Sequence, residues 1–375
     1  MQWLLSSMRF SRKSKVERQK TSSYFERSGL SALSATVLLH IALMTILVGA
    51  CVTHFFGEQG EVHLRADQAQ TLSIQPSAIS SQKAISLFLW DFQVVYDSDN
   101  NPVDYITELR LLDRSRQSRK VDEGTLRMNK PLKYHNWRFC QSNFDSDQLG
   151  VTLRYNYDPW GIGITYTGYA LLLIGMVGFF FQKRSLFRAM LKKSFVFKHS
   201  GLLSLSAVVL IAALATIMTK VVTPKPPLQP VLQTPLLGIH VSVIMLAYTL
   251  FAIIAINGII GLCSRKLSAV SYQLSVILLY PAEFCLMAGI FIGAVWANMS
   301  WGRYWGWDPK ETWALITMLV YALLLHFPWL KTKCKISNHK FEIWYHIFSI
   351  IAFFFVLFTY FGVKYLLGGL HSYAN

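Results

Sequence analysis

A short segment in the C-terminal third of the chain is dense in tryptophan. Five of the 11 tryptophans fall within residues 296–313, together with two glycines and an Asp-Pro step. Indole rings offer large, rigid stacking surfaces with an N–H donor at one edge, and glycine allows close approach to the backbone. An aromatic belt at a membrane interface is the alternative, but belts distribute tryptophans among helix ends. The segment therefore predicts a platform for a flat, apolar, aromatic ligand.

The ten histidines supply the side chains that could bind a metal. His40 and His326 fall inside two expected membrane spans, at similar depth in the inner half of the membrane. An ionisable group there is costly and is a functional candidate by default. His240 and His371 fall at span ends, on the same side of the membrane as the tryptophan segment. The alternative for each is a structural role, either a bond to a nearby carbonyl or a plain interfacial position.

Two further ionisable residues lie in expected spans. His346, early in the last span, competes with His40 and His326 for a functional role because it also lies within the membrane. Glu283, beside Pro281, receives no role from the sequence. The remaining histidines fall near the outer end of the first span, in the segment that follows it, or beside basic loops, and we discount them.

Membrane-spanning helices must position these residues. Of the 375 residues, 53% are hydrophobic and only 15% are charged, and several apolar runs reach the roughly 20 residues that cross a bilayer. The pattern predicts an all-α polytopic membrane protein with about seven transmembrane helices. The expected spans are 31–56, 159–182, 200–218, 236–262, 274–297, 313–330 and 343–363.

Basic residues set the expected orientation. Lysine and arginine gather in residues 1–30 and in the short segments between alternate spans. This bias predicts a cytoplasmic N-terminus, and it places the C-terminus and the tryptophan segment outside the cytoplasm. A net charge of +16 could also indicate nucleic-acid binding, but these charges flank spans, so we expect no nucleic-acid partner.

Residues 57–158 differ from the rest of the chain. Alternating apolar and polar stretches, such as 85–96 and 150–157, are separated by clusters of Asp, Asn, Ser and Gly, a pattern typical of short strands and turns. We expect a small extracytoplasmic β-rich domain between the first two spans. The five cysteines include no CxxC pair, which excludes a zinc ribbon, a thioredoxin-type motif and covalent heme attachment to this chain.

The tryptophan segment also carries a family resemblance. Residues 301–313, Trp-Gly-Arg-Tyr-Trp-Gly-Trp-Asp-Pro-Lys-Glu-Thr-Trp, closely resemble the WWD motif of heme-handling proteins in cytochrome c maturation. The flanks resemble the CcsA family of system II, so that 200–375 looks like a CcsA-type assembly domain with five helices and a WWD loop at 296–313. Pieces of the N-terminal part, at 39–43, 57–65, 129–134 and 156–160, resemble the partner subunit, ResB or CcsB. The chain is thus similar to a natural fusion of the two, with a shortened ResB-like part.

The resemblance implies two sites for heme b. His40 and His326 would ligate heme within the membrane, and His240 and His371 would be the axial ligands of heme held at the outer WWD loop. No side chain is implied as a nucleophile, and positioning would fall to His240, His371 and Asp308. The residues implied in heme binding are Trp296, Trp301, Gly302, Arg303, Trp305, Trp307, Asp308 and Trp313. Arg303 and Lys310 are candidates for pairing with the heme propionates.

The function implied is heme delivery and covalent attachment, through thioether bonds, to apocytochrome c with a CxxCH segment, at the outer face of the bacterial inner membrane. Such a protein would be a holocytochrome c synthase or its heme-handling component, helped by thiol-reducing proteins. A heme carrier or chaperone without synthase activity is the alternative. The shortened ResB-like part also leaves open an accessory paralogue with a structural role.

Overall fold

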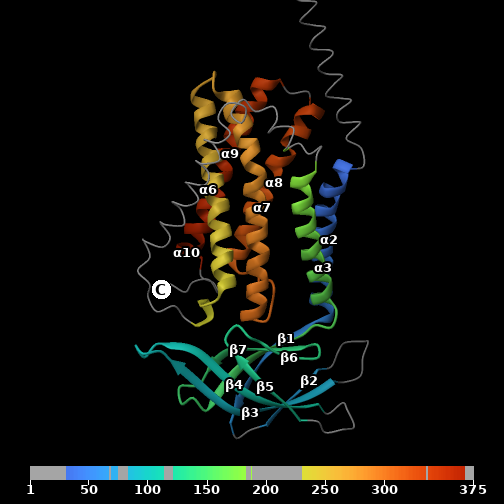
Figure 1. Cartoon of the computed structure of the whole chain (residues 1–375), viewed down its shortest axis with the longest axis vertical. Helices are drawn as coiled ribbons and strands as arrows, with labels where there is room; N and C mark the ends of the chain where they lie inside the picture. The colour runs from blue at the N-terminus through green and yellow to red at the C-terminus, as the bar shows by residue number, and fades with distance from the viewer. Residues whose placement is uncertain are drawn as a thin grey trace, which may run out of the picture.

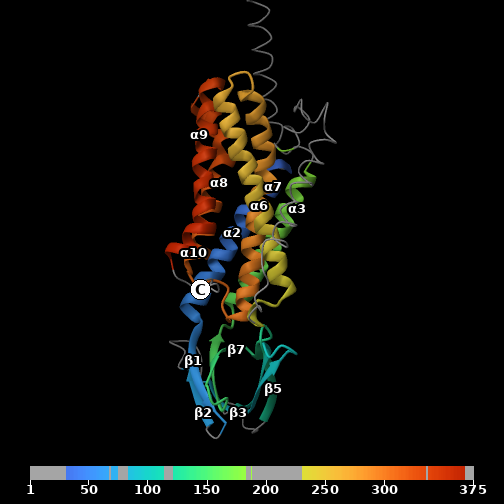
Figure 2. The ribbon, with the colours of Figure 1, turned by 90° about the vertical axis from the view of Figure 1, so that its left-hand side faces the viewer.

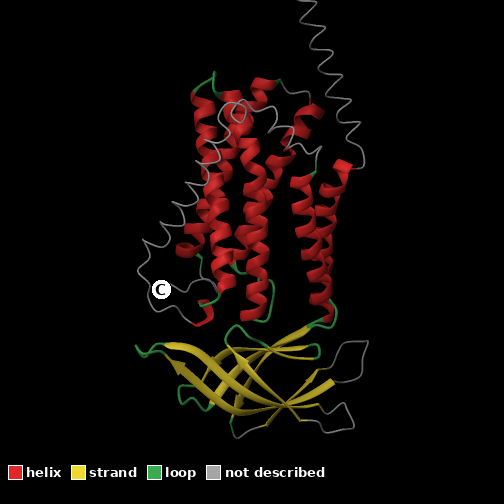
Figure 3. Cartoon of the chain, viewed as in Figure 1, coloured by secondary structure: helices red, strands yellow, loops and turns green. Residues whose placement is uncertain are grey.

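The computed structural model describes residues 31–66, 69–74, 83–113, 121–182, 187, 230–334 and 337–367. Within these ranges, six helices are long and apolar enough to cross a membrane. Helix α2 (Ser31–Phe56) leads into a β domain and α3 (Gly161–Phe181) returns from it. The other long helices are α6 (Pro235–Cys263), α7 (Ser268–Ser300), α8 (Pro309–Cys334) and α9 (Asn338–Leu357). All strands gather at one end of the helical bundle (Figure 1, Figure 3).

The predicted fold class, a polytopic helical protein with a small β domain between its first two helices, is confirmed. The expected third span, 200–218, lies outside the described residues. Helices α7 and α8 both extend beyond their predicted limits, to Ser300 and back to Pro309. The expected loop 296–313 is therefore only residues 301–308, because Trp296 and Trp313 belong to helix ends.

Local signals explain where the helices begin and end. Within a bilayer, a helix satisfies its own backbone groups, so apolar runs of this length fold as helices. Thr234 caps α6, with its hydroxyl oxygen 3.2 Å from the Leu237 N–H that it accepts, and Pro235 fills the first position, where no N–H is needed. Helix α9 continues through a π-helical turn, η2 (Phe358–Gly362), into α10 (Val363–Leu366).

The β domain is a sandwich of two four-stranded antiparallel sheets, with strand orders β1-β8-β7-β6 and β2-β3-β4-β5. Figure 2 shows the two sheets facing each other, and apolar side chains from both fill the space between them. Alternation along each strand places these side chains on one face. The strands are β1 (Glu58–Arg65), β2 (Ala69–Ile74), β3 (Lys83–Tyr96), β4 (Pro102–Asp113), β5 (Val121–Arg127), β6 (Leu132–Tyr134), β7 (Trp137–Phe144) and β8 (Gly150–Tyr157).

Strands β1 and β8 are the entrance and exit of the β domain, and they pair directly, with Glu58 opposite Tyr157. Helices α2 and α3 consequently lie side by side. Glycines allow their close approach: a Cβ atom on Gly168 would lie only 2.6 Å from the Ile46 side chain. Asp158 joins the two helices, because it accepts a hydrogen bond from the Thr53 hydroxyl at 2.6 Å and another from the first N–H of α3.

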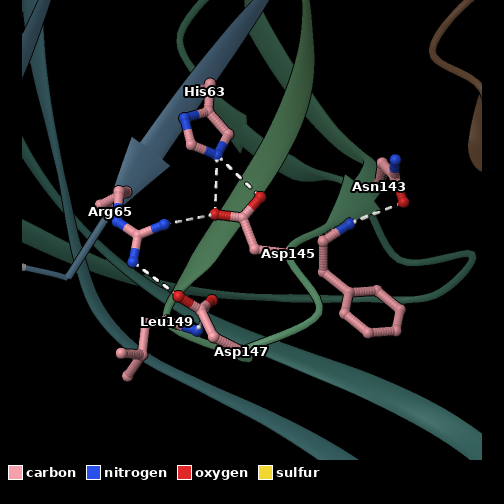
Figure 4. A network of polar contacts seen from close by, with 7 residues as sticks. His63, Arg65, Asn143, Asp145, Asp147 and Leu149 are labelled. Atoms are coloured by element: carbon pink, nitrogen blue, oxygen red, sulfur yellow. Dashed lines mark hydrogen bonds and ion pairs between the residues drawn. The ribbon is translucent and has the colours of Figure 1, made fainter.

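A surface network fastens the far end of β1, away from the helices (Figure 4). His63 Nε2 lies 3.0 Å from both carboxylate oxygens of Asp145 in the β7–β8 turn. Arg65 bridges that carboxylate and Asp147, at 2.8 and 2.7 Å. The contacts link β1 to the turn and account for these side chains without a ligand.

Candidate functional site

The connection between α7 and α8 is short and is fixed by a capping box. Asp308 accepts a hydrogen bond from the Lys310 N–H at 3.0 Å, and Glu311 accepts from the N–H groups of Gly306 and Asp308 at 2.8 and 3.3 Å. Pro309 occupies the first helical position, as is common after such a cap. Asp308 is buried, so its carboxylate shapes the loop and the start of α8.

Among the described residues, the five tryptophans make edge-to-face and tilted ring contacts. Trp296, buried in the last turn of α7, meets Trp301 edge to face at 4.9 Å between ring centroids. Trp305 and Trp307 form a second edge-to-face pair at 5.9 Å. Trp307 is 70% exposed and has a positive φ of 53°, whereas Trp313 packs on Phe358 in the π-helical turn, at 4.2 Å. Trp313 therefore belongs to the α8–α9 contact.

The buried donors at the loop that have no acceptor among the described residues include the indole N–H of Trp296 and Nε of Arg303. The Arg303 guanidinium folds over Gly306, where a Cβ atom would lie 3.0 Å from it. Leaving a buried donor unpaired costs about 1–3 kcal/mol. Two such donors beside clustered indoles suit a ligand that brings oxygen acceptors to an aromatic site, as the propionates of heme would.

His240 lies on α6 with its ring seated against α7. Its Nδ1 is 2.7 Å from the carbonyl oxygen of Gly289, and a Cβ atom on Gly293 would lie 2.6 Å from the ring. When Nδ1–H donates to this carbonyl, the lone pair is on Nε2, which is then the nitrogen that could ligate a metal. Gly293 and Trp296 are three residues apart on α7, so the imidazole lies about one turn from the tryptophans. His371 lies outside the described residues.

His40 on α2 and His326 on α8 face each other, with 6.3 Å between ring centroids and 82° between ring planes. Each Nδ1 bonds the carbonyl four residues earlier in its own helix, at 2.7 Å for His40 and 2.8 Å for His326. Both lone pairs are then on Nε2. A metal held about 2.0–2.1 Å from each of two imidazole nitrogens would separate the ring centroids by roughly 6 Å.

The α2 face around His40 borders an open cavity of about 400 Å³. Its lining is almost wholly apolar, and the lining residues described all belong to α2. The lining residues are Val37, His40, Ile41, Met44, Thr45 and Val48.

Comparison with known proteins assigns both halves of the chain. The profile of the cytochrome C assembly protein family matches residues 166–371. The chain belongs to this family. Its first part, residues 1–158, matches the ResB-like family, so the chain has the domain organisation of a CcsBA-type fusion. His40 lies in the ResB-like part, whereas His240, His326 and the tryptophan loop (residues 301–308) lie in the assembly domain.

Curated relatives agree with this assignment. Protein NrfI of Wolinella succinogenes is 39% identical over 193 residues, which is 48% of this chain and 21% of that protein. Cytochrome c biogenesis protein CcsA of Chlamydomonas reinhardtii is 38% identical over 163 residues, 40% of this chain and 43% of that protein. CcsA of Arabidopsis thaliana is 47% identical over 90 residues, 24% of this chain and 25% of that protein. The chain spans less than half the length of each.

The other intramembrane ionisable residues have different surroundings. His346 is fully buried in the assembly domain, where its Nε2 lies 3.2 Å from the Ser268 carbonyl oxygen and its ring fills the space left by Gly261. That packing is typical of a structural histidine. Glu283 is also buried, and its carboxyl oxygens meet no donor in the described part of the chain.

Proposed function

We propose that this chain binds heme b at two histidine sites and presents it for covalent attachment to apocytochrome c. The observation that supports this most directly is the facing pair His40 and His326. The two residues come from different family domains, and their rings have a spacing that accommodates one metal between two imidazoles. A structural histidine needs no such counterpart on a second helix.

At the inner site, the carbonyl bonds of His40 and His326 hold both rings in the tautomer that leaves Nε2 available. His40 and His326 would hold the iron of a bound heme from its two sides, and they would leave no open position for dioxygen. At the outer site, His240 supplies one ligand, and by family resemblance His371 supplies the other. Trp301, Trp305 and Trp307 offer ring surfaces, and the donors of Trp296 and Arg303 suit the propionates.

The attachment step needs positioning and no protein nucleophile. Each cysteine thiol of a CxxCH segment adds across one heme vinyl group, with sulfur bonding one carbon and hydrogen the other, so no net oxidation occurs. The iron and the thiols must both be reduced, which gives thiol-reducing proteins a place as partners. Holding both reactants in attack geometry contributes up to roughly 7–11 kcal/mol in favourable cases.

The orientation proposed places the β domain and the tryptophan loop outside the cytoplasm of a bacterial inner membrane. The short connection between α6 and α7, which carries Arg265 and Lys266, lies at the opposite end of the bundle (Figure 1). Basic residues at that end favour a cytoplasmic location for it. Heme would then be taken up near His40 and released near His240.

Absorption spectra of the detergent-purified protein test the two sites. We expect sharp reduced α and β bands after dithionite, partly lost in His40→Ala and in His240→Ala, because each variant removes one axial ligand. A colourless wild-type protein that cannot be loaded with heme would overturn the proposal and leave the tryptophan loop as a membrane anchor.

A second experiment separates a synthase from a heme carrier. The chain is expressed in cells that lack all other cytochrome c maturation genes, together with a reporter apocytochrome containing CxxCH. Covalent heme that remains on the reporter through denaturing electrophoresis supports attachment by this chain. Heme-loaded chain without holocytochrome would favour the carrier.

A further inference from the structure

The β domain contacts the tryptophan loop through an asparagine on β8. Asn156 Nδ2 donates to the carbonyl oxygen of Gly302 at 2.9 Å. Gly302 has a positive φ of 76°, and a Cβ atom there would lie 3.1 Å from Cys140 Sγ on β7. The backbone of the loop thus lies directly on the sheet, in a conformation that glycine adopts without strain.

A second asparagine bonds both the end of α7 and the short turn that precedes α6. Asn129 occupies the turn between β5 and β6 with a positive φ of 62°. Its side-chain oxygen accepts from the Ser300 hydroxyl at the end of α7. Its side-chain nitrogen donates to the carbonyl oxygens of Pro230 and Val231, at 3.3 and 3.1 Å, in the short 3-10 turn η1 (Pro230–Leu232) that precedes α6.

Helix α3, which follows the β domain in the chain, makes a further contact with the loop. The Tyr304 ring of the loop meets Tyr166 of α3 at 5.3 Å and Tyr169 at 6.0 Å between ring centroids. The loop that bears Trp305 and Trp307, and the turn that leads to His240, are therefore both fastened to one small domain. No contact of this kind is required merely to fold the sandwich, because its core lies between its own sheets.

We propose that Asn129 and Asn156 are positioning residues of the outer heme site. They hold η1 and the tryptophan loop at a fixed spacing, and so set where His240 stands relative to the indoles. The assignment rests on the proposed function. It gives the ResB-like domain a direct part in the heme site, in addition to any part in receiving the apocytochrome.

The first test needs no heme. Cys140 is 3% exposed beneath Gly302, so its alkylation by a maleimide reports separation of the loop from the sheet. In the full-length chain with the other four cysteines replaced by serine, Asn156→Asp loses the donor to Gly302 and sets a carboxylate against its carbonyl. We expect alkylation of Cys140 about tenfold faster.

Asn143→Asp is the matched control. It makes the same change on β7 of the same sheet but keeps its bond, because the Asn143 side-chain oxygen accepts from the Phe144 N–H at 2.9 Å. Its alkylation rate should equal that of the parent. Equal rates for Asn156→Asp and Asn143→Asp would overturn the contact itself, whether or not the protein binds heme.

The second test asks whether the contact positions the heme site. Asn156→Asp and Asn129→Asp are each placed in two backgrounds: His40→Ala, which leaves the outer site, and His240→Ala, which leaves the inner one. We expect both aspartates to broaden the reduced α band and shift the midpoint potential in the first background only. Equal loss in both backgrounds would mean general destabilisation and would refute a positioning role.

The two tests separate this inference from the proposed function. Faster alkylation of Cys140 together with unchanged outer-site spectra would keep heme binding and reject positioning. A wild-type protein without heme would reject the proposed function and positioning together, and the alkylation rates would then show only a structural contact.

Discussion

At the residue scale, His40, His240 and His326 share one local arrangement. In each, Nδ1 bonds a main-chain carbonyl, at 2.7, 2.7 and 2.8 Å respectively. Such a bond fixes both the tautomer and the orientation of the ring, as is common for metal-binding imidazoles. His40 and His326 use a carbonyl of their own helix, whereas His240 uses one from α7. The orientation of His240 should therefore respond to changes in α7.

Gly293→Ala tests this dependence. The new methyl group would lie 2.6 Å from the His240 ring, so the imidazole must move away from the Gly289 carbonyl. In the His40→Ala background, we expect the reduced α band of the outer site to broaden or disappear. Gly238→Ala on α6 is the control, since nothing lies within 4 Å of its added methyl group. An unchanged spectrum in Gly293→Ala would argue against His240 as a ligand.

Cys140 gives a pH dependence. Burial raises the pKa of its thiol from an ordinary 9.0 to about 11. Because the folded protein favours the protonated thiol, this stabilisation is complete below pH 9 and is lost as the pH rises toward 11. We expect a loss on the order of 1–3 kcal/mol over that range. Thermal unfolding of the wild type and Cys140→Ala across pH 8–11 measures it, and parallel curves would contradict it.

At the residue scale, depth in the membrane was the most useful signal in the sequence: the structure brings the rings of His40 and His326 together, and their role as heme ligands stays a prediction. His40 and His326 could be paired because the ends of apolar runs fix their depth. His346 packs against Gly261 and Ser268, but no sequence pattern distinguishes it from His40 and His326. Asn129 and Asn156 lie in segments that resembled ResB, yet their contacts join residues 171 and 146 positions apart. No periodicity reveals such a contact.

At the element scale, the tryptophan loop is shaped mainly by the helix that follows it. Asp308 and Glu311 close a capping box on α8, and Trp313 is already helical. The pattern Asp-Pro-Lys-Glu is a helix-start signal that can be read from sequence. The predicted loop was longer than the observed one, because its limits were set by tryptophans and Trp296 and Trp313 lie in helices. Hydropathy alone placed the described spans but shortened α7 and α8 at their polar ends.

The variant Asp308→Asn tests whether Asp308 acts only as a helix cap or also through its negative charge. Asparagine caps helices about as well as aspartate, so we expect the thermal stability and heme spectrum to change little. Asp308→Ala removes the acceptor and should cost about 1 kcal/mol, seen as a lower unfolding temperature. Loss of heme binding in Asp308→Asn would show that the negative charge itself matters.

Gly168→Leu tests the contact between α2 and α3. The larger side chain would collide with Ile46, pushing α2 away from α3 and moving His40 relative to His326. We expect the inner-site spectrum to be lost in the His240→Ala background. Gly163→Leu on the same helix is the control, because no atom lies within 4 Å of its Cβ position. Equal effects of both leucines would point to a general disturbance of α3.

At the scale of the whole molecule, two family domains share each proposed site. The inner pair takes one histidine from each domain, and the outer loop lies against the sheet of one and the helices of the other. Composition and periodicity predict the two kinds of domain but carry no information on how they meet. That arrangement depends on hydrogen bonds between loops, which are set only when the chain has folded.

Because β1 pairs with β8, the chain enters and leaves the β domain at adjacent points, next to α2 and α3. Residues inserted at the far end of the β domain leave the distance between these two points unchanged, so they do not alter the spacing of α2 and α3. The β3–β4 turn, where Asn100 is exposed with a φ of 62°, is one point on the sandwich that should accept an inserted reporter. The ResB-like part could therefore vary widely in size over evolution while the spacing of the helical histidines stayed the same.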